Sequence, residues 1–181
     1  MPPNMRAIRQ YSYGGPEVLR LESVPRPEPS PTEVLVRVHA AGVNPVDWKT
    51  RAGTYADAVL GEPPFTVGWD VSGVVERLGS GVTRFAIGDE VYGLARFPRQ
   101  AGAYAEYVTA PSRHFARKPS GLSHTEAAGL PLAGLTVWQA LVETAQVRPG
   151  QRVLVHAAAG GVGHLAVQLA KHLGTYQSDR K

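Results

Sequence analysis

A glycine-rich turn, Ala159-Gly-Gly-Val-Gly163, joins an apolar segment to an amphipathic one near the end of the sequence. Residues Arg152–His156 before it predict a short buried strand, and Gly161–Leu173 predict a helix. Gly160 lets the backbone approach a phosphate because it has no Cβ, and Gly163 lets the helix pack closely on the strand. Free amides at the start of a helix attract anions. The turn therefore predicts a site for the pyrophosphate of a dinucleotide, formed by Ala159, Gly160, Gly161, Val162 and Gly163.

The rest of the usual dinucleotide fingerprint is incomplete. The common G-x-G-x-x-G pattern would place its first glycine at Ala158, so this turn is a variant. An acidic residue about 20 positions further on should bind the ribose at the end of a second strand. Asp179 stands near that distance, but Thr175–Ser178 has no apolar run to form that strand. The sequence therefore leaves NADPH and NADH both open, and a purely structural turn without a ligand remains the alternative.

The chain has no cysteine, which excludes disulfides, iron–sulfur clusters, cysteine nucleophiles and thiolate zinc sites. Three of the histidines, His39, His114 and His124, share no spacing typical of metal ligands. Ser72 and Ser112 have no His–Asp pattern beside them in the sequence, so nothing supports serine hydrolysis.

These groups must be positioned by two kinds of structure. Short segments rich in β-branched residues, separated by turns, predict a partly closed β-barrel. The expected strands are Arg6–Tyr11, Val18–Val24, Val34–Val43, Val71–Leu78, Glu90–Leu94, Ala103–Thr109 and His114–Arg117. Asn44–Arg51 predicts one or two helical turns. After Ser123, which begins a capping-box pattern with Glu126, the periodicity becomes helical, and Leu132–Ala145 predicts a second helix. The fold class is mixed β and α/β, with a boundary near residue 125.

Composition and charge limit the partners. The net charge of +4 is modest, and the basic residues are scattered, which does not favour nucleic-acid binding. The start of the chain lacks the apolar stretch of a signal peptide, and the longest uncharged run, Ala127–Val142, is too short for a membrane span of about 20 residues. We expect a cytoplasmic protein with a small-molecule substrate, and leave assembly into a homo-oligomer open.

Several motifs together resemble the medium-chain dehydrogenase/reductase superfamily. They are Gly73–Gly93, Gly102–Tyr107, Gly42–Asp47 and His156–Gly163, and the last two resemble its quinone oxidoreductase (zeta-crystallin-like) branch. The resemblance covers residues 5–174. It implies a GroES-like β-barrel followed by a Rossmann domain, with residues 1–125 and 126–181 as their respective parts and the active site between them. It further implies NADPH-dependent reduction of quinones, enones or similar activated carbonyl compounds.

The resemblance also implies roles for individual residues. Asn44, Asp47 and Lys49 lie in the segment that faces the cleft in this family. Asn44 would donate through its amide, Lys49 would stabilise an enolate-like oxygen, and Asp47 would orient Lys49. Thr136 matches a threonine near the nicotinamide. A helix cap at Asn44 and a solvated surface lysine at Lys49 are the structural alternatives. Tyr55 and Trp69 are candidate cleft aromatics, with core packing as the favoured role.

Zinc ligands of the superfamily's zinc enzymes are replaced in this chain. Asn44 stands where those enzymes have a cysteine, and Gly68-Trp69-Asp70 stands where they have Gly-His-Glu. An amide and an indole are not zinc ligands, and Asp70 alone cannot hold the ion. We therefore predict that the protein binds no metal.

Only one strand and one helix of a Rossmann domain are expected in this sequence, which indicates a truncated domain. Two interpretations follow. The favoured one is an NAD(P)H-dependent oxidoreductase represented by its N-terminal part. The alternative is a non-catalytic GroES-like binding or assembly module.

Overall fold

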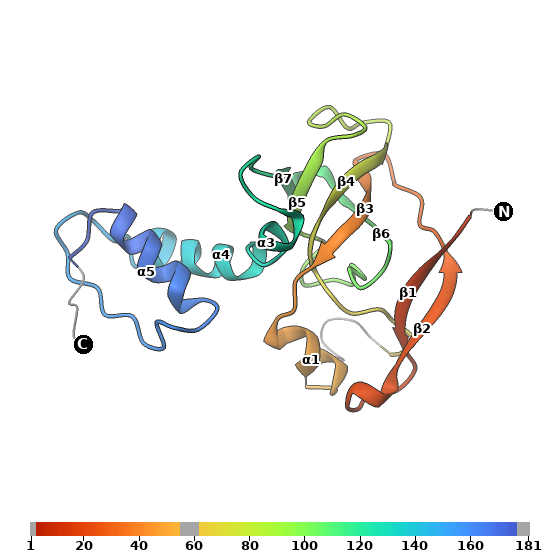
Figure 1. The fold of residues 1–181 in the computed structure, drawn as a ribbon, viewed down its shortest axis with the longest axis horizontal. Coiled ribbons are helices and arrows are strands. Elements are labelled where there is room, and N and C mark those ends of the chain that lie inside the picture. The colour runs from red at the N-terminus through yellow and green to blue at the C-terminus, as the bar shows by residue number, and fades with distance from the viewer. Residues whose placement is uncertain (1–2, 55–61, 177–181) are drawn as a thin grey trace. The chain divides into compact units, whose positions relative to one another are not determined.

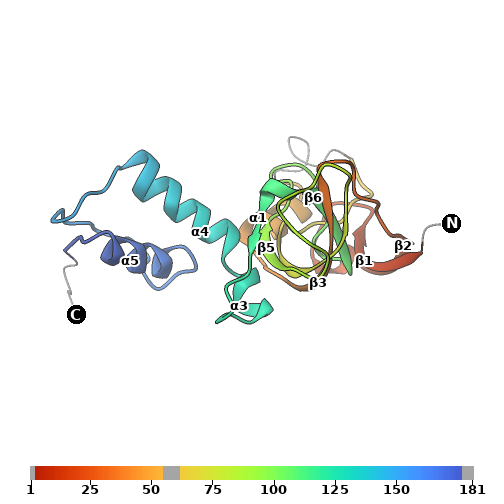
Figure 2. The same ribbon diagram turned by 90° about the horizontal axis from the view of Figure 1, so that it is seen from above.

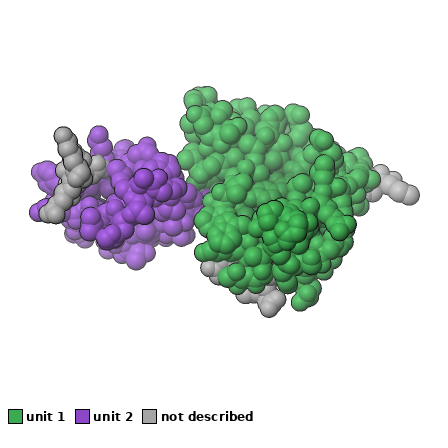
Figure 3. Space-filling model, turned by 60° about the horizontal axis from the view of Figure 1, so that its bottom comes forward, with its two compact units in different colours: residues 1–131 green, residues 132–181 purple. Residues whose placement is uncertain are grey.

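The computed structural model describes residues 3–54 and 62–176, and the chain forms two compact units. Unit 1 comprises Met1–Pro131 and unit 2 comprises Leu132–Lys181, as coloured in Figure 3. The division falls a few residues after the boundary expected near residue 125.

Unit 1 is built of antiparallel strands (Figure 1). β1 and β2 pair with each other, and the other five strands form one sheet in the order β6-β3-β4-β5-β7. These strands match the predicted segments to within a few residues, because β-branched and apolar residues favour extended backbone and the turns between them end each strand. Their bounds are β1 Asn4–Gln10, β2 Leu19–Pro25, β3 Glu33–Ala41, β4 Asp70–Leu78, β5 Glu90–Leu94, β6 Tyr107–Pro111 and β7 Phe115–Arg117.

The core of unit 1 lies inside the curved five-stranded sheet, whose strands surround it in Figure 2. It is made mainly of valines from the middle of the strands, closed by Phe85 and Phe115. Gly73 of β4 is required where two strands come closest, because a Cβ there would lie 2.0 Å from the carbonyl oxygen of Arg37 in β3. The predicted barrel is therefore confirmed by its packing.

One predicted strand begins later than expected. Ala103–Thr109 was expected to be extended throughout, but β6 begins at Tyr107. The reason is that the amides of Ala103 and Tyr104 donate to the carbonyls of Gly68 and Val67, at 2.9 and 3.2 Å, instead of joining the ladder of β3. Tyr104 is thereby held beside the segment that leads into β4.

Two short α-helices lie in the part of unit 1 that the structure describes. α1, Pro45–Arg51, has Asn44 as its N-cap and Pro45 in its first turn. α3, His124–Ala128, is capped by Ser123, whose Oγ accepts from the amide of Glu126 at 3.2 Å. The Glu126 carboxylate accepts in return from the Ser123 amide at 2.8 Å, so the capping box predicted from the sequence is confirmed. Two single-turn 3-10 helices, η1 (Pro16–Val18) and η2 (Ser112–His114), link strands.

Up to Tyr176, the last residue described, unit 2 has three helical segments and the glycine turn. They are α4, Pro131–Trp138, which begins on the last residue of unit 1, the π-helix η3, Gln139–Thr144, and α5, Gly163–His172. The helix predicted over Leu132–Ala145 is thus continuous in extent but changes to π geometry after Trp138. The predicted end of the last helix is confirmed, since Gly174 has a φ of +77°.

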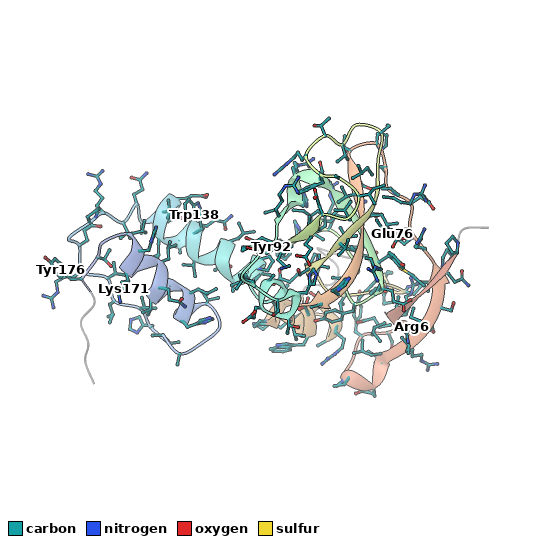
Figure 4. All side chains as sticks on the ribbon, turned by 45° about the horizontal axis from the view of Figure 1, so that its top comes forward. Arg6, Glu76, Tyr92, Trp138, Lys171 and Tyr176 are labelled. Atoms are coloured by element: carbon teal, nitrogen blue, oxygen red, sulfur yellow. The ribbon has the colours of Figure 1, made fainter. Side chains whose placement is uncertain are left out.

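The prediction of a buried strand at Arg152–His156 is wrong for the described residues. Only Arg152 pairs there, in an isolated parallel bridge to Tyr176, and the side chain of Leu154 is 75% exposed. A parallel strand needs neighbouring strands and covering helices to bury an apolar run, and Tyr176 supplies a single bridge. Figure 4 labels Trp138 and Tyr176, two further apolar residues of unit 2 that are exposed.

Within the described ranges, no helix combines the length and apolar character needed to cross a lipid bilayer.

His114, in η2, makes the stability of unit 1 depend on pH. Its Nδ1 accepts from the backbone N–H of Arg96 at 2.9 Å, which requires an unprotonated nitrogen. Burial, with the charges of Arg113 and Arg96, lowers the pKa of His114. A histidine with a lowered folded pKa stabilises the fold fully above its unfolded pKa of about 6.5. That stability is lost as the pH falls from about 6.5 towards the folded pKa.

We therefore expect the free energy of unfolding to be smaller at pH 5.5 than at pH 7.5, as measured by urea unfolding. His114→Gln, whose amide oxygen can still accept from Arg96, should reduce the difference. An unchanged difference in this variant would show that His114 is not its source.

Candidate functional site

Asn44 stands at the turn between β3 and α1, in extended backbone with φ −123° and ψ 158°. Pro45 at the first helical position fixes the start of α1. The carboxylate of Asp47 accepts from the backbone N–H of Asn44 at 2.6 Å, as the acidic residue of a capping box does. The helix start therefore holds the backbone of Asn44, and its half-buried side chain is left for other contacts.

The side-chain amide of Asn44 is bound by a second carboxylate. Its Nδ2 donates to Oδ2 of Asp70 at 2.9 Å. Asp70 is the first residue of β4 and is only 1% exposed. The sequence pointed to Asn44 but not to this partner, which lies 26 residues further along the chain.

Asp47 is buried, with a relative exposure of 2%, and its contacts differ from those expected. It was predicted to orient Lys49, yet its carboxylate bonds to Asn44 and interacts with the hydroxyl of Tyr104. Burial raises the pKa of Asp47, against the lowering effect of the Asn44 amide. Burial, followed by the charge of Asp47, raises the pKa of Tyr104 far above its ordinary value. The Tyr104 hydroxyl oxygen and Oδ1 of Asp47 are both buried, and neither meets the distance and angle criteria of a hydrogen bond with any described residue.

Lys49 is half-buried on α1, with its ammonium 5.5 Å from the centre of the Trp48 ring. A cation–π contact of this kind is weak at an exposed site, about 0.5–1 kcal/mol. Trp48 is 48% exposed, so the pair lies at the surface of unit 1. The charge of Lys49 is thus available to a ligand near α1 and is not locked in an ion pair with Asp47.

In unit 2, the glycine turn leads directly into α5 and is closely packed at Gly163. Gly163 is buried, and a Cβ there would lie 2.1 Å from the carbonyl oxygen of Ala157. Gly161 faces open space, and a Cβ at Gly160 would come within 3.2 Å of the same carbonyl. Ala159 to Val162 are exposed at the start of α5, where the first amides of a helix have no partner within it. The residues present therefore fit a pyrophosphate.

Thr136 lies on α4 and is exposed, but its hydroxyl is engaged by the helix itself. Its Oγ1 donates to the carbonyl oxygen of Leu132 at 2.7 Å. The hydroxyl proton is therefore already used, and the oxygen remains able only to accept a hydrogen bond.

Of the two candidate cleft aromatics, Trp69 belongs to the core. It is 1% exposed, its Nε1 donates to the carbonyl of Arg99 at 2.8 Å, and Phe97 packs against it edge-on at 5.6 Å. The favoured prediction of core packing is confirmed. Tyr55 and Asp179 lie outside the described residues.

A second polar cluster of unit 1 was missed by the sequence analysis. Nδ1 of His124 lies 2.8 Å from Oγ of Ser72, and its Nε2 lies 3.2 Å from the carboxylate of Glu90. The ring of His39 stacks on that of His124 at 4.4 Å. The order of groups resembles a catalytic triad, but Ser72 is completely buried and its hydroxyl also bonds to the carbonyl of Val91. This cluster therefore anchors α3 on the sheet, and only the fold brings its members together.

A metal centre is not apparent in residues 3–54 and 62–176, where no three His, Asp or Glu side chains gather as ligands. At the positions where the zinc enzymes have ligands, the Trp69 indole is a donor already bound to Arg99, and the Asn44 amide is bound to Asp70.

Comparison with known proteins assigns the family. Residues 30–120, half of the chain, match the alcohol dehydrogenase GroES-like domain. A human quinone oxidoreductase is 41% identical over 94% of this chain and 50% of its own. An Arabidopsis thaliana chloroplastic NADPH-dependent alkenal/one oxidoreductase is 42% identical over 96% of this chain and 46% of its own.

A solved structure gives the same assignment. The quinone oxidoreductase from Coxiella burnetii superposes with a TM-score of 0.87 at 46% identity, over 96% of this chain and 55% of its own. The chain spans about half the length of the relatives it matches. The predicted fold class, a GroES-like barrel followed by the beginning of a Rossmann domain, is confirmed. The chain thus belongs to the medium-chain dehydrogenase/reductase superfamily, in its quinone oxidoreductase (zeta-crystallin-like) branch.

Proposed function

We propose that the chain is the N-terminal part of an NADPH-dependent reductase of quinones, enones or similar activated carbonyl compounds. The observation that carries this proposal is the Asn44 side-chain amide, whose Nδ2 donates to Asp70 while Asp47 accepts from the backbone N–H of the same residue. Among the residues that the structure describes, the second N–H of this amide makes no hydrogen bond. A hydrogen-bond donor fixed in this way suits the oxygen of a carbonyl compound, on which negative charge develops during reduction. The charge of Lys49 would add to this stabilisation, and Asp47 would keep the helix start in place.

The cofactor contacts are proposed for unit 2. The amides of Ala159, Gly161, Val162 and Gly163 would bind the pyrophosphate. The Gly160 amide donates to the carbonyl of Ala157 at 2.9 Å, so Gly160 would contribute the space left by its missing Cβ. Thr136 would accept a hydrogen bond from the carboxamide N–H of the nicotinamide. The nicotinamide supplies the hydride when it is bound. NADPH is favoured by the name of the Arabidopsis relative, and NADH is kept as the alternative. The functional boundary is proposed near residue 125, with residues 1–125 as the catalytic part.

The alternative function is a non-catalytic GroES-like binding or assembly module. Two observations favour it: Arg152 and Tyr176 form only a single bridge, and the side chain of Leu154 is exposed. The described part of unit 2 therefore has no packed sheet. Adenine and ribose contacts normally come from further strands of such a sheet.

The two functions differ in turnover. NADPH oxidation would be followed with 1,2-naphthoquinone and with an enone, using the full-length Coxiella burnetii enzyme as the positive control. We expect the 181-residue chain alone to be slower by at least about a thousandfold, because orientation of the reactants contributes about 7–11 kcal/mol in favourable cases. Turnover equal to that of the Coxiella enzyme would overturn this expectation. Residual turnover above the rate without protein supports the reductase, whereas NADPH binding with no such turnover favours the module.

The prediction that the protein binds no zinc has its own test. Inductively coupled plasma mass spectrometry of tag-free protein, purified from medium supplemented with zinc, should give well below one zinc ion per chain. The reason is the absence of cysteine and the engagement of Trp69 and Asn44 with other partners. Stoichiometric zinc that survives dialysis against a chelator would contradict it.

A further inference from the structure

Asp70 is placed to determine how the Asn44 amide is presented. It lies on β4, paired with Leu94 of β5 in the five-stranded sheet, so its backbone belongs to a rigid element. The amide of Gly42 donates to its carbonyl at 3.0 Å. The chain passes so close at Gly42 that a Cβ there would lie 2.8 Å from the Cβ of Asp70. The sheet and the Gly42 turn therefore both restrict the position of the Asp70 backbone and Cβ, from which the carboxylate extends.

This carboxylate selects one orientation of the amide. An asparagine side chain can turn its oxygen and nitrogen either way, and only the nitrogen can donate to a carboxylate. Since Nδ2 of Asn44 lies 2.9 Å from Asp70 Oδ2, one N–H points at Asp70. The second N–H then has a defined direction. Asp47 also accepts from the backbone N–H of Asn44, so hydrogen bonds hold both the backbone and the side-chain amide of this residue.

The charge of the Asp70 carboxylate also affects which ligands the site prefers. A ligand oxygen that accepts the second N–H would lie about 5 Å from the Asp70 carboxylate, given ordinary hydrogen-bond lengths of about 2.9 Å. A neutral carbonyl oxygen is compatible with this arrangement, whereas a ligand that already carries a full negative charge close to it is repelled. The charge that develops on a neutral ligand during reduction would be offset by Lys49, as proposed above.

We infer that Asp70 is a positioning residue that orients the Asn44 amide and makes the site prefer neutral carbonyl ligands to anionic ones. The inference rests on the proposed function, since it takes Asn44 as the group that meets the substrate.

The positioning role is tested by nuclear magnetic resonance of the ¹⁵N-labelled chain, without substrate. The side-chain NH2 signals of Asn44, assigned from their loss in Asn44→Ala, should exchange with water slowly. Asp70→Asn keeps an oxygen that accepts and loses the charge, so exchange should be intermediate. Asp70→Leu loses both and should exchange at least about tenfold faster, because a charged hydrogen bond is lost. Asp89→Asn, the same change at a turn remote from α1, is the matched control and should leave these signals unchanged.

Backbone amide spectra of each variant show whether it is folded. Equal exchange of the Asn44 amide in the wild type and in folded Asp70→Asn and Asp70→Leu would overturn the positioning role.

The selectivity is tested with a matched pair of probes, 1,2-naphthoquinone and 1,2-naphthoquinone-4-sulfonate, titrated against the Asn44 signals. The neutral quinone should bind at least about threefold more tightly, and Asp70→Asn should reduce the difference. Tighter binding of the sulfonate would show that Lys49 dominates and would overturn the selectivity. If neither quinone shifts the signals although their exchange depends on Asp70, the proposed function fails and the positioning role stands.

Discussion

Trp69→Ala should destabilise unit 1 by about 3–5 kcal/mol, the usual cost of truncating a large buried aromatic side chain. Trp69 is 1% exposed and packs edge-on against Phe97. Its loss would leave a cavity and would also leave the carbonyl of Arg99 without the indole donor. The measurement is urea unfolding followed by circular dichroism, compared at the same pH for the wild type and the variant.

Trp48→Ala is the matched control, because it makes the same change at a residue that is 48% exposed. It should alter the free energy of unfolding by no more than about 0.5 kcal/mol. Trp69→Phe separates packing from the hydrogen bond, and it should cost less than Trp69→Ala. Equal stability of the wild type and Trp69→Ala would show that Trp69 is not part of the core and would reopen its role as a ligand-binding aromatic.

Gly163→Ala should disrupt the glycine turn of unit 2. The new Cβ would lie 2.1 Å from the carbonyl oxygen of Ala157 and 2.8 Å from the Cα of Ala158, and both are backbone atoms that cannot rotate away. Overpacking of this kind costs about 1–3 kcal/mol or more. The start of α5 would have to move, so NADPH affinity, measured by nicotinamide fluorescence, should fall by at least about tenfold.

Two other glycines of the turn provide controls. Gly161→Ala adds the same methyl group in open space and should leave the thermal unfolding curve unchanged. Gly160→Val should reduce NADPH binding more than it reduces stability, because its branched side chain would occupy space needed by the pyrophosphate. If Gly163→Ala unfolds and binds NADPH as Gly161→Ala does, then the close contact with Ala157 is not needed for either property.

Local signals in the sequence predicted the elements of unit 1 well. Short segments rich in β-branched residues predicted most strands, and Ser123 with Glu126 predicted the start of α3, because both signals act over a few residues. The same is true of Asn44 and Pro45 before α1. The glycine turn could also be predicted, because the chain approaches itself so closely at Gly163 that only glycine fits there.

Features that depend on residues far apart in the sequence could not be predicted from the sequence. Arg152–His156 has the composition of a strand, but a strand forms only where another chain segment supplies the ladder, and the described residues supply one bridge at Tyr176. The late start of β6 likewise depends on the bonds from Ala103 and Tyr104 to the segment before β4.

The sequence by itself determined the family, the absence of thiolate ligands and the segment that carries Asn44, because residue types and short spacings are enough for these. Only the tertiary structure decided what each side chain does there. It turned Asp47 towards Asn44 and Tyr104 instead of Lys49, and it joined Asn44 to Asp70 across 26 residues. The physical reason is that hydrogen bonds between residues far apart in the chain are set by how strands and helices pack, and no local pattern encodes that packing.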